Sequence, residues 1–155
     1  LRPSLEADDV MGILLTNKTL WKKRGWTDVI QVSEDKDQRT IAGKLYNPNR
    51  PELGVIKVSE LDALRFLLWQ TICGDQTDGY SGCKGVGKNS IWAEAILEET
   101  DPLEMWDWVL CAYFSKGLTE EDALVQVRMA NILKSHDWDY KNNKPIYWTT
   151  ANLLY

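Results

Sequence analysis

Strand patterns are confined to the first 58 residues of this sequence, and every strong pattern from Ser59 onward is helical. The run VIQVS at 29–33 predicts a short buried strand, and residues 41–58 predict one or two strands around a Pro/Asn turn. This order predicts the α/β class. We expect one compact unit with an α/β part over 1–73, which would bind metal, and a helical region over 74–155.

Polar caps place the expected helices. Ser59 with Asp62 resembles a capping box, and Asp101 before Pro102 marks another helix start. Ser4 is a candidate cap for the first helix. The expected helices cover, in chain order, residues 4–17, 59–73, 88–98, 101–116 and 119–135. We expect a basic, aromatic connector at 19–26, a polar loop at 33–40 and an extended aromatic cover at 140–155.

The composition excludes some classes of function. The formal net charge of −5 argues against a protein that simply coats DNA, but not against a nuclease, because carboxylates that bind metal make the metal-free charge too negative. No apolar run is long enough to span a membrane, so we expect no membrane partner. Three widely spaced cysteines form neither a disulfide framework nor a zinc pattern, and they favour a reducing, cytoplasmic setting.

Two acidic groups occur before residue 40. Glu6, Asp8 and Asp9 fall in the first turns of the first expected helix, where the helix dipole alone would favour acids. Three acids in four residues are more than the helix dipole alone accounts for, and a shared cation would relieve the repulsion between them. Asp35 and Asp37 follow the 29–33 strand, and both carboxylates point to the same side if the chain stays extended there. An acidic surface loop is the alternative.

A third acidic group, Asp75 and Asp78, lies just past the end of the 59–73 helix. The helix dipole disfavours anions there, so a cation would compensate; an ordinary polar turn is the alternative. All three groups lie at the ends of expected elements, where side chains can converge. Oxygen ligands suit Mg²⁺ or Mn²⁺ rather than zinc, and the only histidine, His136, lies far along the chain. Two such ions could hold a phosphodiester for hydrolysis.

A glycine turn, GCKGVGK at 82–88, follows the third acidic group. Its glycines allow a tight turn with exposed backbone N–H groups, and the next helix adds its positive N-terminus. The spacing differs from that of a P-loop, and no strand precedes the turn. We expect it to grip phosphates without distinguishing bases. The candidate DNA-binding residues are Gly82, Lys84, Gly85, Val86, Gly87 and Lys88.

Taken together, these motifs resemble the 5′-nuclease or flap-endonuclease superfamily. EADD at 6–9, SEDKD at 33–37 and GDQTDGYSGCKGVG at 74–87 follow the family's order, and TEEDALVQVRMANIL extends the similarity towards the C-terminus. The chain is most similar to the 5′→3′ double-strand DNA exonucleases of podovirus-type phages. The resemblance implies a partial Rossmann-like (PIN-like) parallel sheet, then a helical region with a helix-hairpin-helix motif. It also implies hydrolysis of DNA from a 5′ end or flap, in phage replication, primer removal or DNA degradation.

The resemblance further implies two metal positions for Mg²⁺ or Mn²⁺, built from carboxylates that are the catalytic residues. Glu6 and Asp8 would serve the first position. The second would be served by Asp9, Asp35, Asp37, Asp75 and Asp78. The turn at 82–87 would grip the duplex backbone, with a potassium ion held by its carbonyl groups.

The chain departs from the family at its start. It begins at Leu1, whereas family members carry an N-terminal region with two further aspartates and a basic arch that threads the 5′ end. The first metal position would then be incomplete. We expect a fragment, or the C-terminal half of a split enzyme in which a second polypeptide supplies the N-terminal half. A non-catalytic duplex-DNA-binding module is the alternative.

Overall fold

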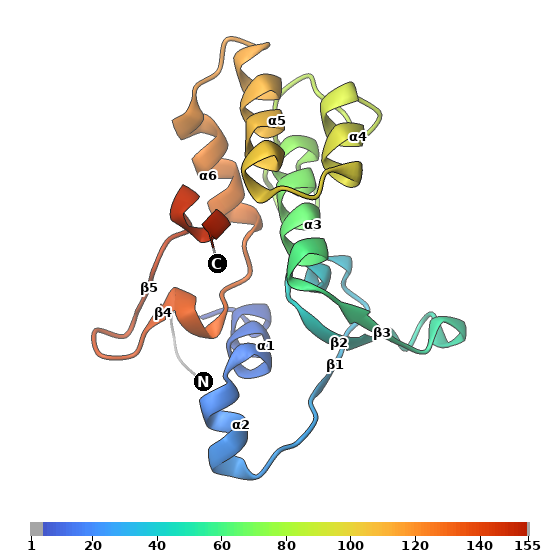
Figure 1. Cartoon of the computed structure of the whole chain (residues 1–155), viewed down its shortest axis with the longest axis vertical. Coiled ribbons are helices and arrows are strands. Elements are labelled where there is room, and N and C mark those ends of the chain that lie inside the picture. The colour runs from blue at the N-terminus through green and yellow to red at the C-terminus, as the bar shows by residue number, and fades with distance from the viewer. Residues whose placement is uncertain (1–4, 155) are drawn as a thin grey trace. The chain divides into compact units, whose positions relative to one another are not determined.

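The structure is a computed structural model, and it describes residues 5–154. The chain forms two units, each built from separated segments. The sheet unit comprises Leu1–Ala63 with Ile132–Tyr147, and the helical unit comprises Leu64–Asn131 with Trp148–Tyr155. Figure 1 labels their elements. Leu1 and the expected cap Ser4 lie outside the described residues.

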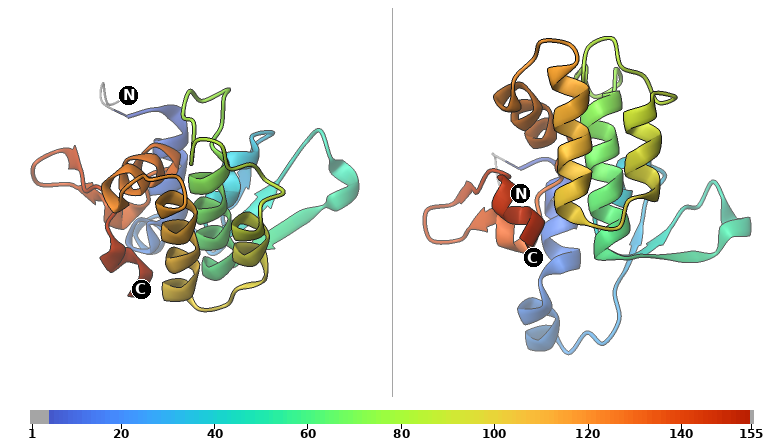
Figure 2. Two further views of the ribbon diagram at one scale, coloured as in Figure 1. Left: turned by 90° about the horizontal axis from the view of Figure 1, so that it is seen from above. Right: turned by 45° about the horizontal axis from the view of Figure 1, so that its top comes forward.

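A mixed sheet of three strands forms in the sheet unit, and it confirms the α/β class. β1 (Ile30–Val32) pairs parallel with β2 (Gly43–Tyr46), and β2 pairs antiparallel with β3 (Val55–Val58). The expected parallel arrangement therefore holds for β1 and β2 alone. β3 runs the other way because a short protruding loop reverses the chain after β2, whereas parallel neighbours need a longer crossover. Figure 2 shows this loop extending from the sheet.

The burial of β1 is the reverse of what its sequence predicts. Gln31 is buried, whereas the apolar Ile30 and Val32 are 44% and 59% exposed. Gln31 lies opposite Leu45 of β2, which in turn lies opposite Ile56 of β3, so these three side chains share the inward face. The outward face carries Ile30 and Val32 instead. The expectation of a buried strand is therefore wrong for its two apolar ends.

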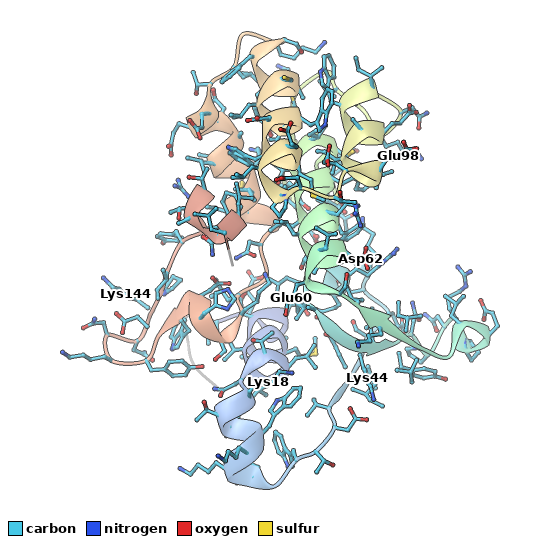
Figure 3. The ribbon with its side chains drawn as sticks, viewed as in Figure 1. Lys18, Lys44, Glu60, Asp62, Glu98 and Lys144 are labelled. Carbon is cyan, nitrogen blue, oxygen red and sulfur yellow. The ribbon has the colours of Figure 1, made fainter. Side chains whose placement is uncertain are left out.

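Two helices open the described chain. α1 (Ala7–Thr16) buries Gly12, Ile13 and Leu15, whereas the apolar side chains of Val10 and Leu14 are exposed. α2 (Lys18–Arg24) replaces the connector expected at 19–26. The Asn17 side chain accepts a hydrogen bond from the Leu20 N–H at 2.8 Å and caps α2 at its start. Figure 3 labels Lys18 at the first position of α2.

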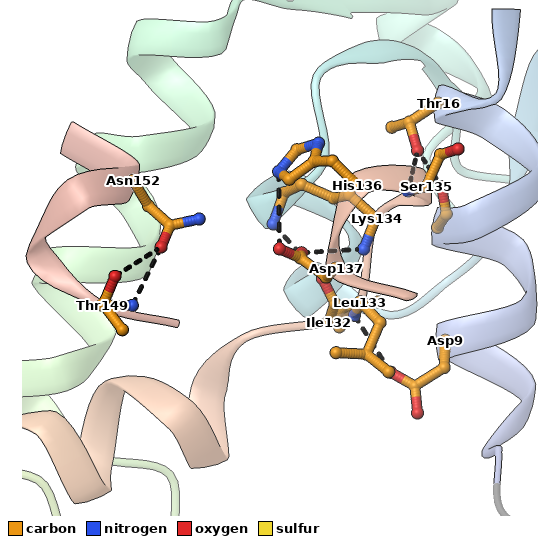
Figure 4. Close-up of polar contacts among 11 residues, drawn as sticks. Asp9, Thr16, Ile132, Leu133, Lys134, Ser135, His136, Asp137, Thr149 and Asn152 are labelled. Carbon is orange, nitrogen blue, oxygen red and sulfur yellow. Dashed lines mark hydrogen bonds and ion pairs between the residues drawn. The ribbon is translucent and has the colours of Figure 1, made fainter. Parts of the chain in front are cut away.

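The segment after α6 docks on α1 within the sheet unit (Figure 4). The Leu133 N–H donates to Asp9 at 3.0 Å, and the Ser135 N–H donates to the Thr16 hydroxyl at 2.7 Å. Between these contacts, a Cβ on Gly12 would meet the Leu133 oxygen at 2.4 Å, so only glycine permits this approach. A 3-10 turn (Ser135–Asp137) and a small hairpin of β4 (Trp138–Asp139) and β5 (Lys144–Pro145) follow. The expected extended cover is thus partly folded.

Four helices build most of the helical unit. α3 (Glu60–Cys73) begins in the sheet unit, where the Ser59 hydroxyl accepts from the Asp62 N–H at 3.0 Å, as its capping pattern predicts. Glu60 and Asp62 are labelled in its first turn in Figure 3. The other helices are α4 (Ile91–Glu98), α5 (Pro102–Phe114) and α6 (Glu120–Ala130). Figures 1 and 2 show α3, α4 and α5 side by side.

The last helix is shorter than its pattern. α6 starts where its pattern predicts, after Thr119, which forms a capping box with Asp122, but it ends at Ala130 instead of near residue 135. The chain turns away there and supplies the segment that docks on α1. A final 3-10 helix (Thr150–Leu154) follows Trp148, whose ring packs 5.2 Å from that of Trp106. Among the described helices, none is long and apolar enough to cross a membrane.

Candidate metal-binding and DNA-binding residues

The first two acidic groups meet in the sheet unit through a glutamine. The Gln38 side chain donates a hydrogen bond from Nε2 to Asp8 Oδ1 at 2.7 Å, across 30 residues of sequence. Gln38 follows Asp37 directly and is fully buried, as Asp37 nearly is. The structure therefore joins the start of α1 to the segment that follows β1, and a shared metal site for their acids stays a prediction.

Asp35 and Asp37 do not have the extended backbone on which their parallel orientation depends. The Asp35 carboxylate accepts a hydrogen bond from the Asp37 N–H at 2.8 Å and caps a 3-10 helix (Lys36–Thr40). This turn leaves Asp35 exposed and directs Asp37 into the interior, where it is 7% exposed. The expectation that an extended chain aligns the two carboxylates is therefore wrong, because a short aspartate side chain captures the N–H two residues ahead.

Glu6 and Asp9 have different surroundings. Glu6 precedes α1, is exposed, and caps the helix with its backbone but not with its side chain. One oxygen of Asp9 is engaged by the Leu133 N–H. Asp9 therefore anchors the docked segment in addition to any metal-binding role, which stays a prediction.

The third acidic group lies in the helical unit, in the loop that follows α3. Asp75 is 8% exposed and forms a two-way backbone bridge with Tyr80, at 2.9 and 3.0 Å. Its Oδ1 also accepts from the Thr77 N–H at 2.7 Å. Carboxylate oxygens of Asp75 and Asp78 lie within 4.8 Å of each other. The loop thus places a buried and an exposed carboxylate side by side.

Two glycines close this loop. Gly74 and Gly82 both have positive φ, at 68° and 62°. The Gly82 N–H donates to the Gln126 side chain of α6 at 2.8 Å, so this donor is already engaged within the protein. The Cys83 N–H returns to the Ile72 carbonyl at 2.8 Å. Gly82 thus has a clear structural role, and its contact with DNA stays a prediction.

The turn after Gly82 exposes its lysines. Lys84, Gly85 and Lys88 are exposed, whereas Val86 is buried and anchors the turn. Gly85 has φ of 79°, which favours glycine. Lys116 lies close to it, with its Cε 4.0 Å from where a Gly85 Cβ would be. Sequence analysis missed Lys116 because it follows α5 and is separated from the turn by two helices.

The thiols near the turn are poor ligands and nucleophiles at neutral pH. Burial raises the pKa of the Cys73 thiol to about 11, although the nearby charge of Lys88 acts in the opposite direction. Burial also raises the pKa of Cys83, against the charge of Lys116. Because the thiolate is the form that binds metal, oxygen atoms are the better ligands here. Close carboxylates with oxygen-only chemistry, such as Asp75 and Asp78, fit a hard divalent cation.

The chain is similar to phage nucleases over nearly its whole length. It is 29% identical over 177 residues to a protein named "Exonuclease" from Escherichia phage T7, a match that covers 94% of this chain. It is also 29% identical over 181 residues to a protein named "Exodeoxyribonuclease" from Enterobacteria phage T3, with 95% of this chain covered. These relatives support the relationship to phage exonucleases that the motifs predict.

The chain spans 56% of the length of each of these curated relatives. No family model matches it, and no solved structure does. The assignment to the wider 5′-nuclease superfamily and the helix-hairpin-helix motif therefore stay predictions.

Proposed function

We propose that this chain is the metal-binding and duplex-binding part of a magnesium-dependent 5′→3′ exodeoxyribonuclease or flap endonuclease. Similarity to phage exonucleases along 94% of the chain is the observation that carries the proposal. Asp75 and Asp78 add to it, because carboxylate oxygens within 4.8 Å of each other suit a shared divalent cation. DNA with a 5′ end is the proposed substrate, in phage replication, primer removal or DNA degradation.

The proposed ligands are seven carboxylates, with Mg²⁺ or Mn²⁺ as the ions. When bound, two such ions would supply the positive charge that phosphodiester hydrolysis requires. The chain's own residues would orient the ions and exclude other ligands. The set comprises Glu6, Asp8, Asp9, Asp35, Asp37, Asp75 and Asp78.

The turn at 82–88 is the proposed grip on the duplex backbone. Lys84 and Lys88 would attract phosphates as exposed point charges, and the exposed Gly85 and Gly87 leave room for a close backbone approach. Backbone carbonyls of the turn could also hold a potassium ion. This grip would be independent of base sequence, as a degradative exonuclease requires.

A second polypeptide is the proposed source of the remaining half. Among the described strands, β1 is an edge of the sheet, and its Ile30 and Val32 are exposed on the outward face. An apolar edge strand of this kind is a ready site for a further strand. The relatives' greater length is consistent with such a segment.

The test is cleavage of a 5′-labelled duplex in magnesium, by this chain alone and then with a polypeptide corresponding to the N-terminal part of the phage T7 exonuclease. We expect 5′→3′ cleavage with the added polypeptide and its loss in the Asp37→Asn/Asp75→Asn double variant, which keeps both side-chain shapes. Cleavage by the double variant at the wild-type rate would refute the metal assignment. Cleavage by the chain alone would show that the second polypeptide is unnecessary.

A non-catalytic duplex-binding module is the second candidate. The glycine turn and its lysines lie entirely in the helical unit and are complete without the carboxylates of the sheet unit. This candidate predicts duplex binding without cleavage under both conditions, and binding that Asp35→Asn and Asp37→Asn leave unchanged. A gel-shift titration beside the cleavage assay distinguishes the two candidates.

A further inference from the structure

Two buried glutamines form a chain of hydrogen bonds that ends on Asp8. Gln38 is 0% exposed and Gln31 is 6% exposed. Gln31 donates from Nε2 to Gln38 Oε1, and Gln38 donates from Nε2 to Asp8 Oδ1 at 2.7 Å. An ionised carboxylate can only accept, so the amide nitrogen of Gln38 must face Asp8. Its oxygen must then face the amide nitrogen of Gln31, and the direction of the whole chain is determined.

Two buried glutamines contribute less to the stability of the fold than apolar side chains at the same positions would. The inward position of β1 lies opposite Leu45, where an apolar side chain would pack best, and two valines and an isoleucine flank it in sequence. Instead Gln31 occupies it, while Ile30 and Val32 remain exposed. Burying two amides costs free energy that their hydrogen bonds only offset, whereas apolar side chains of similar size would add stability.

The two glutamines have the properties that orient a metal-binding carboxylate. The Gln38 amide occupies one oxygen of Asp8 and restricts its side-chain rotamers, and Gln31 restricts the Gln38 amide in turn. Gln38 is also the next residue after Asp37, so the backbone turn that buries Asp37 places the Gln38 amide against Asp8. Partners of this kind typically affect metal affinity by 10- to 100-fold when removed.

We propose that Gln38 is a positioning residue that holds the Asp8 carboxylate for metal binding, and that Gln31 holds Gln38. The proposal rests on the proposed function, because it takes Asp8 as a metal ligand. It assigns a role to two residues that neither the acidic motifs nor the glycine turn contains.

The test measures Mn²⁺ binding by electron paramagnetic resonance, without DNA and without turnover. It uses this chain mixed with the N-terminal polypeptide of the phage T7 exonuclease, because the metal position of Asp8 is proposed to need both. Gln38→Met keeps the length of the side chain and removes its donor, and we expect about tenfold weaker Mn²⁺ binding. Gln31→Met leaves the Gln38 amide in place but unrestrained, so we expect a smaller loss of Mn²⁺ affinity than in Gln38→Met. Tyr113→Phe is the matched control: it removes a buried 2.7 Å hydrogen bond to the Thr71 carbonyl in the helical unit and should leave Mn²⁺ affinity unchanged.

Asp8→Asn separates this inference from the proposed function. If Asp8→Asn weakens Mn²⁺ binding and Gln38→Met does not, the positioning role is wrong and the metal site stands. If Asp8→Asn leaves Mn²⁺ binding at the wild-type level, Asp8 is not a ligand, and this inference and the metal assignment of Asp8 are both overturned. Should Gln38→Met fail to fold, Gln31→Met decides: wild-type affinity in that variant refutes the chain of two glutamines. A stability loss equal to that of Tyr113→Phe, with unchanged affinity, would show a purely structural role.

Discussion

A Cβ on Gly82 would lie only 2.3 Å from the backbone nitrogen of Gly74, so the loop that carries Asp75 and Asp78 is closed by two glycine backbones in contact. Gly82 also has φ of 62°. We expect Gly82→Ala to lower the free energy of unfolding by about 3 kcal/mol or more, because left-handed strain and a clash with backbone atoms add together. Urea denaturation monitored by tryptophan fluorescence measures this loss.

Two other glycines separate the two contributions. Gly79 has φ of 79° and nothing within 4 Å of its Cβ position, so Gly79→Ala should cost only the strain, about 1–2 kcal/mol. Gly87 has neither a positive φ nor a neighbour there, so Gly87→Ala should be neutral or stabilise by about 0.5 kcal/mol. Equal losses for Gly82→Ala and Gly79→Ala would show that the close approach to Gly74 costs nothing.

Asp9 should show separable structural and metal-binding roles. Asp9→Asn keeps an oxygen to accept the Leu133 N–H but loses the charge, whereas Asp9→Ala loses both. We expect Asp9→Ala to destabilise the fold by about 1 kcal/mol and Asp9→Asn to leave stability nearly unchanged. Both variants should weaken Mn²⁺ binding if Asp9 is a ligand. Wild-type Mn²⁺ affinity in Asp9→Asn would reduce the role of Asp9 to that of an anchor.

Lys116 should contribute to duplex binding although the motif at 82–88 does not include it. We expect Lys116→Ala to weaken binding and to lower the slope of log affinity against log salt by about 0.9, the value for one lost phosphate contact. Fluorescence anisotropy with a labelled duplex at several salt concentrations measures the slope. Lys141→Ala, at an exposed lysine in the sheet unit, is the control. Equal slopes for Lys116→Ala and the wild-type chain would exclude the contact.

The Cys73 thiol predicts a loss of stability in alkali. Its pKa is raised from 9.0 to about 11 by burial, so between these values the unfolded chain loses this proton while the folded chain keeps it. The free energy of unfolding therefore falls as pH rises from 9.0 towards about 11. Urea denaturation at pH 8 and 10.5 measures this fall in the free energy of unfolding. Cys73→Ala should show a smaller fall than the wild-type chain, whereas Cys111→Ala, at an exposed thiol, should show the same fall as the wild-type chain. An unchanged fall in Cys73→Ala would contradict this assignment.

The outward face of β1 should take part in association with the proposed second polypeptide. Ile30→Thr/Val32→Thr retains β-branched side chains, so β1 should still form, while apolar surface is lost. We expect about tenfold weaker binding of the N-terminal polypeptide of the phage T7 exonuclease by calorimetry. Ile146→Thr, at a residue 49% exposed in the same unit, is the matched control. Equal effects of the two changes would place the interface elsewhere.

Capping residues in this sequence predicted the starts of α3, α5 and α6, whereas α2 was not expected and α4 begins at Ile91 rather than near Lys88. The Ser59–Asp62 pair and the Asp101 cap form as expected, because a cap needs only residues within one turn. Thr119 also caps α6, and Asp122 completes a capping box there. The end of α6 could not be predicted in the same way. Its helical pattern continues to residue 135, but the contacts of Leu133 and Ser135 with α1 draw that segment out of the helix.

Contacts between distant parts of the chain also limited what could be predicted of the candidate site. The motifs identified the acidic groups, yet the side chain of β1 that points inward is Gln31 rather than a neighbouring apolar residue. Which face of a strand is buried depends on its partners in space, and no period of two residues marks it in so short a strand. Gln38 was missed because a single glutamine beside an aspartate has no signature of its own.

The docking of Leu133 on Asp9 joins residues 124 positions apart, which has a consequence for synthesis on the ribosome. In the order of synthesis α1 precedes the helical unit, but the segment that covers it follows residues 64–131 of that unit. The surface of α1 around Gly12 therefore stays uncovered while residues 64–131 are translated. A truncated messenger RNA that ends within α6 would yield a chain in which the docking surface of α1 stays exposed. Chains with such exposed surfaces are targets for chaperones and proteases.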